Sequence, residues 1–351
     1  MQQLPKNPSL TYAEAGVDIN HTDAVKAEMA PLIGAGDPRV LNGLGPFASL
    51  YDINFPKIKE PVLVLKAEEP GSKQKLAAQY GYMESICHDM VNHLVNDIIV
   101  MGARPLAVLD TIVCGYAEPE TVRTIIRGLS NACRENECSL VGGETSVQPG
   151  VVEKGIYILT SSIAGIADKK NILDGSTVAE GDAVLAVASN GLHTNGYSLV
   201  RRLMENDQEL INESVENYTF LEAIMKPHTP YYRAVKDLFG DEALTGMAHI
   251  TGGGIEGNLS RIMLEGLCAS IDLSKIHIPA IFKRIKALTK ATEEEMLRTF
   301  NCGVGLVVVA RGGEAGANRI QRHIQQYYDC RVVGHVTQGS KKVRFINTLP
   351  W

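Results

Sequence analysis

Polar residues that weaken a helix form a single stripe on the helix predicted at residues 84–102. On a helical wheel, apolar residues cover most of the surface, and the remaining narrow sector holds Asp89, Asn92, His93, Asn96 and Asp97. Asn, Asp and His are weaker helix formers than the Lys, Glu and Arg residues that usually face solvent. The stripe therefore favours polar groups directed at a ligand, such as a metal ion and phosphates, over a solvated face.

Two glycine-containing loops each lead from a predicted strand into a predicted helix. In "SNGLHTNGYSLVRR" (189–202) the loop carries His193 and Asn195, and in "HITGGGIEGN" (249–258) it carries Gly252–Gly254. The N-terminus of a helix offers free N–H groups and favours an anion. The pair of loops predicts a substrate with a phosphate or several polar groups, although His193 could equally be a loop histidine with one structural hydrogen bond.

Two further segments combine carboxylates with glycine. In "VGGETSVQPG" (141–150), Glu144 directly follows Gly142 and Gly143, which would let a ligand approach the backbone closely, but an ordinary turn can have this sequence. In "LVLKAEEPGSKQKLA" (63–77), Glu68 and Gly71-Ser72-Lys73 lie between a strand and a helix. That segment is either a loop that holds a phosphate or an exposed turn.

Composition limits the class of protein. The chain has 351 residues, 45% hydrophobic and 21% charged, which suits a soluble globular protein of two domains. A net charge of −6 argues against a broad nucleic-acid surface. The sequence "MQQLPKNPSL" lacks the apolar core of a signal peptide and no run of 18 apolar residues occurs, so we expect a cytoplasmic protein without membrane contact. Seven scattered cysteines offer no Cys-x-x-Cys pair, and no histidine spacing suits zinc.

Hydrophobic patterns place the elements that would position these residues. We expect strands at 61–67, 106–113, 138–145, 155–167, 183–189, 246–250 and 303–310, with two short strands after the last helix. Helices are expected near 22–33 and at 84–102, 119–136, 197–204, 259–266 and 317–328. A polar, turn-rich stretch at 168–182 divides the chain into domains 1–168 and 169–351. The first half has an α+β pattern, and strands alternating with helices predict an α/β second domain.

Seven blocks, in order along nearly the whole chain, resemble the aminoimidazole ribonucleotide synthetase (phosphoribosylformylglycinamidine cyclo-ligase) family. They are "YAEAGVDI" (12–19), "GLGPFASL" (43–50), "VNDIIVMGARPLAVLD" (95–110), "CSLVGGET" (138–145), "SNGLHTNGYSLVRR" (189–202), "GMAHITGGGIEGN" (246–258) and "RTFNCGVGLVVV" (298–309). Walker, dinucleotide-binding, kinase and serine-hydrolase signatures are absent. Seven ordered blocks are more specific than any single motif.

The resemblance implies a homodimer in which mainly antiparallel N-terminal sheets pair into a shared barrel, each packed on a C-terminal α/β domain. It also implies use of ATP and Mg²⁺ to phosphorylate the amide oxygen of formylglycinamidine ribonucleotide. An internal nitrogen then attacks the activated carbon, phosphate leaves and the imidazole ring closes. In phosphoryl transfer of this kind, positioning and charge stabilisation do most of the catalysis.

The resemblance also implies roles for the residues of this chain that match the family's motifs. Expected at the reaction centre are His193, Lys73 and Asn195. Expected to bind ATP or substrate are Gly71, Ser72, Lys73, Asn96, Asp97, Gly142, Gly143, Glu144, Gly252, Gly253 and Gly254. Expected to bind the metal are Glu68, Asp89, Asp97 and Glu144.

Two departures from the family pattern bear on ATP. The family carries Asp-Gly-Val-Gly-Thr-Lys where this chain has Glu68-Glu69-Pro70-Gly71-Ser72-Lys73. Glutamate sets its carboxylate about 1.5 Å further out, and Mg²⁺ tolerates little error in its octahedron; we expect the backbone to compensate. The family's ATP-linked N-terminal lysine has no counterpart at the same spacing, since the helix at 22–33 offers only Lys26. The alternatives are an ATP-using relative with another acceptor, of the kinase or selenophosphate type, and a non-catalytic nucleotide-binding paralogue.

Overall fold

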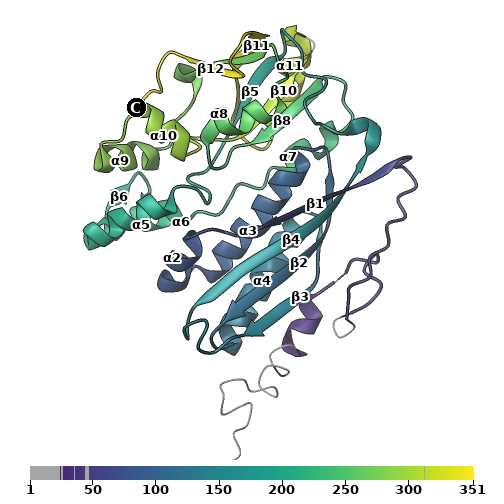
Figure 1. The fold of residues 1–351 in the computed structure, drawn as a ribbon, viewed down its shortest axis with the longest axis vertical. Coiled ribbons are helices and arrows are strands. Elements are labelled where there is room, and N and C mark those ends of the chain that lie inside the picture. Colours follow the sequence, from purple (N-terminus) through teal and green to yellow (C-terminus); the bar gives the residue numbers. More distant parts are fainter. Residues whose placement is uncertain (1–23, 25–26, 35, 44–46, 312) are drawn as a thin grey trace, which may run out of the picture.

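The computed structural model describes residues 24, 27–34, 36–43, 47–311 and 313–351. Two sheets with helices against them form the two halves of the chain, and the second half lies above the helices of the first (Figure 1). The first family-like block and Lys26 lie outside the described residues, as do parts of the second block and of the helix expected near 22–33. None of the described helices is both long and apolar enough to cross a membrane.

The first sheet has four strands in the order β1 (Pro61–Glu68), β4 (Tyr157–Asp168), β2 (Arg104–Cys114) and β3 (Ser139–Val147). β4 pairs antiparallel with both β1 and β2, whereas β2 and β3 are parallel. The predicted strands and the mainly antiparallel pairing are therefore correct. The sheet is open, and within the described residues no sheet closes into a barrel.

Helices cover one face of this sheet and leave the other bare. Helices α3 (Met83–Ile99) and α4 (Pro119–Glu135) pack their apolar faces on the sheet, and α2 (Lys73–Tyr80) joins β1 to α3. On the opposite face, large apolar side chains are exposed, among them Leu65 at 71% and Leu109 at 44%. Burial of apolar surface drives folding and association, so this face is a candidate contact surface.

The second sheet has six strands in the order β12-β9-β11-β5-β10-β8. They are β5 (Ala183–Ala188), β8 (Leu244–His249), β9 (Leu267–Asp272), β10 (Val304–Ala310), β11 (Cys330–Gln338) and β12 (Val343–Ile346). Only β12 and β9 pair in parallel. The domain is α/β in its order of elements, as expected, and β10 inserts antiparallel between β5 and β8, so the sheet is mainly antiparallel.

Helices of the second domain pack on this sheet or on one another. They are α5 (Tyr197–Asn206), α6 (Phe220–Met225), α7 (Tyr232–Val235), α8 (Gly254–Leu259), α9 (Ala280–Thr289), α10 (Glu293–Thr299) and α11 (Gly313–Ile324). The helix expected at 259–266 is wrong in position, because α8 already begins at Gly254 and ends at Leu259. A Cβ at Gly254 would lie 1.7 Å from Leu297 O, so only glycine lets α8 begin against α10.

Candidate functional site

The polar stripe of α3 binds the backbone of the second domain. Asp89 Oδ1 accepts the His228 N–H at 2.9 Å, Asn92 Nδ2 donates to His228 O at 2.8 Å, and Asn96 Nδ2 donates to Thr229 O at 2.9 Å. The side chains of Asp89, Asn92 and Asn96 are all buried. Buried backbone groups need hydrogen-bond partners, and these side chains supply them for the segment between α6 and α7. Asn96, expected to bind nucleotide, therefore joins the two domains.

Lys73 forms a fully buried ion pair with Asp89. Its Nζ lies 2.7 Å from Asp89 Oδ2, and both side chains have an exposed fraction of 0%. Lys73 also donates to Lys226 O at 2.7 Å and to His193 O at 3.1 Å. Burial raises the pKa of Asp89 to about 6, opposed by the charge of Lys73 and the N–H of His228. The expected roles of Lys73 at a phosphate and of Asp89 at a metal do not fit this closed pair.

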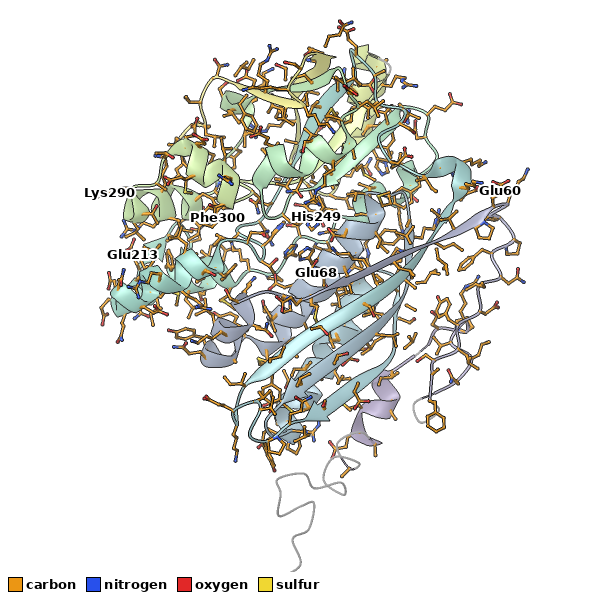
Figure 2. All side chains as sticks on the ribbon, viewed as in Figure 1. Glu60, Glu68, Glu213, His249, Lys290 and Phe300 are labelled. Atoms are coloured by element: carbon orange, nitrogen blue, oxygen red, sulfur yellow. The ribbon has the colours of Figure 1, made fainter. Side chains whose placement is uncertain are left out.

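A second lysine, Lys66 on β1, lies between two carboxylates at the domain junction. Its Nζ is 3.0 Å from Glu68 Oε2 and 3.0 Å from Asp97 Oδ2. Asp97 Oδ1 accepts a hydrogen bond from His249 Nδ1 at 2.7 Å, and His93 Nε2 lies 3.7 Å from Asp97 Oδ2. Figure 2 shows Glu68 on the first domain close to His249 at the end of β8. Burial alone would raise the pKa of Asp97, but the His249 and Lys66 contacts hold it well below its usual range.

The four residues expected to bind magnesium do not form one site in the chain. Asp89 is paired with Lys73, while Glu68 and Asp97 share the Lys66 ammonium, which already supplies the positive charge between them. Glu144 lies on β3 at the opposite edge of the sheet from β1. Three strand spacings separate those edges, about 14 Å. The carboxylates as arranged do not fit a magnesium ion.

Glu144 instead faces a cavity of about 860 Å³ on the bare side of the first sheet. Gly142, Gly143 and Asp110 also line this cavity. Burial and the charge of Glu144 raise the pKa of Asp110 to about 7. A Cβ at Gly143 would lie 2.1 Å from Asp110 Oδ1, and a Cβ at Gly142 would lie 2.7 Å from Ser49 Oγ, so each glycine is required by a different neighbour. Sequence reasoning missed Asp110, which ends one of the family-like blocks.

The loops of the second domain meet at the junction. The backbone of His193 has φ 60°, a left-handed conformation, and its side chain is fully buried. A Cβ at Gly252 would lie 3.5 Å from Asn195 Oδ1, so the loops after β5 and β8 are neighbours. Asn195 Nδ2 is buried without a hydrogen-bond partner, which leaves a donor for a ligand oxygen.

The loop after β1, which departs from the family pattern at residues 68–70, lies against the loop after β5. Gly71 has φ 63°, and a Cβ there would be 3.7 Å from Thr194 O. Ser72 precedes α2 without capping it through its side chain. Gly71 and Ser72, expected to bind ATP, therefore lie at the domain junction, whereas the sequence analysis missed Lys66 and His249. His249 comes just before the glycines of its loop, and that position at a strand end is the signal that could have found it.

Two domains, each an open sheet covered by helices, meet in a junction of glycine loops, carboxylates and histidines. This arrangement agrees with two family models, "AIR synthase related protein, N-terminal domain" over residues 55–167 and "AIR synthase related protein, C-terminal domain" over 179–347. The chain belongs to the AIR synthase related family. The resemblance drawn from the sequence blocks is confirmed.

Curated relatives of the chain are enzymes with one name. The phosphoribosylformylglycinamidine cyclo-ligase of Methylobacillus flagellatus is 40% identical over 310 residues, covering 88% of this chain and 89% of the relative. That of Burkholderia multivorans is 38% identical over 317 residues, covering 90% of each. The similarity extends over both domains, so the expectation of a cyclo-ligase-type enzyme is confirmed at the level of the family.

Solved structures with the same fold are more distant in sequence. Escherichia coli HypE has a TM-score of 0.66 and 16% identity, covering 93% of this chain and 94% of that one. Thiamine-monophosphate kinase from Stenotrophomonas maltophilia has a TM-score of 0.63 and 16% identity, covering 92% and 94%. PurL of T. maritima, complexed with AMPPCP, has a TM-score of 0.55 and 16% identity, covering 83% and 43%. These likenesses establish the fold alone.

Proposed function

We propose that the protein catalyses ATP-dependent ring closure of formylglycinamidine ribonucleotide to aminoimidazole ribonucleotide, with release of ADP and phosphate, in purine biosynthesis. One observation carries the proposal: Asp97 of the first domain, which shares Lys66 with Glu68, contacts His249 of the second domain in a chain 37–40% identical to cyclo-ligases. ATP as the co-substrate is supported by neighbours of the same fold solved with ATP or AMPPCP.

The residues at the junction suit phosphoryl transfer by positioning and charge. Lys66 is 36% exposed and is the cation that a phosphate can reach, while Asn195 Nδ2 offers an unused donor. Burial holds the pKa of His193 well below its usual range, so its imidazole is neutral and can orient substrate without adding charge. The γ-phosphoryl group passes to the amide oxygen and ADP leaves; an internal nitrogen then attacks the activated carbon and loses a proton, and phosphate carries the oxygen away. Because Lys66 holds Glu68 and Asp97, no step is assigned to magnesium.

The bare face of the first sheet supports a homodimer as part of the same proposal. Leu63, Leu65 and Leu109 expose 54%, 71% and 44% of their surface there, and a second copy would cover them and close the two open sheets into a shared barrel. Light scattering should give twice the chain mass for the wild type and for Leu264→Arg, an exposed leucine of the second domain. Leu65→Arg should be monomeric. A monomeric wild type, or a dimeric Leu65→Arg, contradicts the dimer.

One assay tests the function. Formylglycinamidine ribonucleotide, ATP and Mg²⁺ are supplied, and ADP and aminoimidazole ribonucleotide are measured together. Equal amounts of both products are expected. ADP without the imidazole product would indicate another acceptor. Bound nucleotide with neither product would favour a non-catalytic paralogue, for which the ammonium of Lys66 between Glu68 and Asp97 is the specific support.

A further inference from the structure

Four of the nine histidines gather at the domain junction, although they come from four separate segments. His93 lies on α3, His193 follows β5, His228 precedes α7 and His249 ends β8. The ring centroids of His193 and His228 are 4.2 Å apart, and those of His228 and His249 are 5.6 Å apart. Their exposed fractions lie between 0% and 8%. The proposed ring closure gives His228 no role.

In three of these rings, one nitrogen lies within hydrogen-bond distance of a side-chain oxygen, and the other nitrogen has no hydrogen-bond partner. His193 Nε2 lies 3.3 Å from Thr229 Oγ1, His228 Nε2 lies 2.9 Å from Thr194 Oγ1, and His249 Nδ1 lies 2.7 Å from Asp97 Oδ1. The remaining nitrogens are buried and make no hydrogen bond; they are His193 Nδ1, His228 Nδ1 and His249 Nε2. Buried polar atoms are nearly always satisfied, so three orphaned nitrogens in one cluster indicate a missing ligand.

The spacing of the three rings suits a single metal ion. One ring nitrogen from each of His193, His228 and His249 lies within 4.8 Å of the others. Tetrahedral zinc at about 2.0–2.1 Å from each nitrogen brings its ligands to about 3.3 Å from one another. Binding would therefore require the rings of His193 and His228, which stack with 28° between their planes, to turn and draw together. Histidine ligands usually pass their second N–H to a carboxylate or another oxygen. Asp97 Oδ1 and Thr194 Oγ1 offer such oxygens to His249 and His228, whereas His193 Nε2 also accepts the backbone N–H of Thr229 at 3.4 Å.

The chemistry of the donors selects the class of metal. Imidazole nitrogens suit zinc, nickel, cobalt and copper, whereas magnesium prefers oxygen ligands. Asp97 supplies a negative charge next to the cluster.

We propose that His193, His228 and His249 bind one divalent transition-metal ion of the zinc type. Three protein ligands leave a fourth position for water or a substrate atom. Asp97 acts as a positioning residue, because it fixes the orientation of His249. All three ligands belong to the second domain and the positioning carboxylate belongs to the first, so the ion would also strengthen the domain junction. The site shares His193 and Asp97 with the proposed cyclo-ligase site, but its test measures metal binding and not turnover.

Metal binding by the untagged full chain tests this site. The protein is stripped with a chelator, dialysed against Zn²⁺ and analysed for metal by mass spectrometry, and Co²⁺ loading is followed by visible absorption. One Zn²⁺ per chain and the intense absorption of tetrahedral Co²⁺ are expected. His228→Gln should weaken Zn²⁺ binding at least about 100-fold, and Asp97→Asn about 10–100-fold.

His335→Gln is the matched control, because His335 is exposed on β11 and far from this cluster in sequence. It should keep the wild-type Zn²⁺ affinity. Less than about 0.2 Zn²⁺ per wild-type chain, an octahedral Co²⁺ spectrum, or equal affinities in the His228 and His335 variants would overturn the site. If circular dichroism shows that His228→Gln does not fold, the same comparison is made with His249→Gln, and the wild-type Co²⁺ spectrum still decides.

Discussion

Two lysine–carboxylate clusters lie at the same domain junction and differ in exposure and in their contacts with the second domain. Lys73 and Asp89 are completely buried, and Lys73 also donates to two backbone carbonyls of the second domain. Lys66, Glu68 and Asp97 are 36%, 26% and 20% exposed. A charged group can bind a ligand only if it is not already fully committed, so the first cluster holds the domains together and the second is available for chemistry.

The same helix supplies a carboxylate to both clusters. Asp89 and Asp97 are eight positions apart on α3, about 12 Å along the helix axis. At Asp89 the backbone of the segment between α6 and α7 covers the carboxylate, and at Asp97 the second domain contributes only the His249 ring. The carboxylate that the backbone covers, Asp89, therefore has a structural role, and the carboxylate that it leaves partly exposed, Asp97, is available for function.

Removal of the lysine from the buried cluster should give the largest effect. Lys73→Met leaves Asp89 as an uncompensated buried charge, which costs about 3–5 kcal/mol in unfolding free energy. Urea unfolding monitored by circular dichroism measures the change. Lys75→Met, on the exposed side of the same helix, should change the free energy by less than about 0.5 kcal/mol.

The reason for that loss can be isolated with a second change. Asp89→Asn in the Lys73→Met background removes the buried charge and keeps an oxygen to accept the His228 N–H. The double variant should recover at least half of the lost stability, because a removed pair costs far less than a broken one. No recovery would mean that the carbonyl contacts of Lys73, rather than its charge, hold the junction.

Changes in the exposed cluster should act on turnover instead. Asp97→Asn and Glu68→Ala are each expected to lower turnover at least about tenfold, since misplaced groups in phosphoryl transfer cost activity rather than folding. Steady-state formation of aminoimidazole ribonucleotide and a thermal unfolding curve are measured together. Glu69→Ala, at the exposed neighbouring position, is the control. Wild-type turnover in Glu68→Ala would remove this loop from the mechanism.

The sequence predicted most elements of the fold because their patterns are local. Strand β1 and helices α3 and α4 lie within a few residues of their expected bounds. The polar stripe on α3 was also predicted, but the backbone groups that it binds were not. Asn96 binds a carbonyl 133 positions away, and nothing in the local pattern distinguishes a backbone carbonyl from a phosphate as the partner of an amide.

The histidine cluster could not be predicted for the same reason: its members are far apart in the sequence. Spacing rules for zinc examine histidines that are close in sequence, whereas His193 and His249 are 56 positions apart and meet only because β5 and β8 flank β10. Lys66 was missed for a similar reason. Its contact with Glu68 is local, because both residues lie on β1, but its contact with Asp97 depends on how β1 lies against α3.

Removal of the lysine from the exposed cluster should have the smallest effect on stability, and this result is the sharpest test of the comparison. Lys66→Met should change the unfolding free energy by less than about 1 kcal/mol, because partly exposed ion pairs contribute little. The variant should bind Mg²⁺ more tightly in a calorimetric titration, since the ammonium no longer neutralises Glu68 and Asp97. A loss as large as that of Lys73→Met would show that both clusters are structural, and the distinction drawn from their exposure would then be wrong.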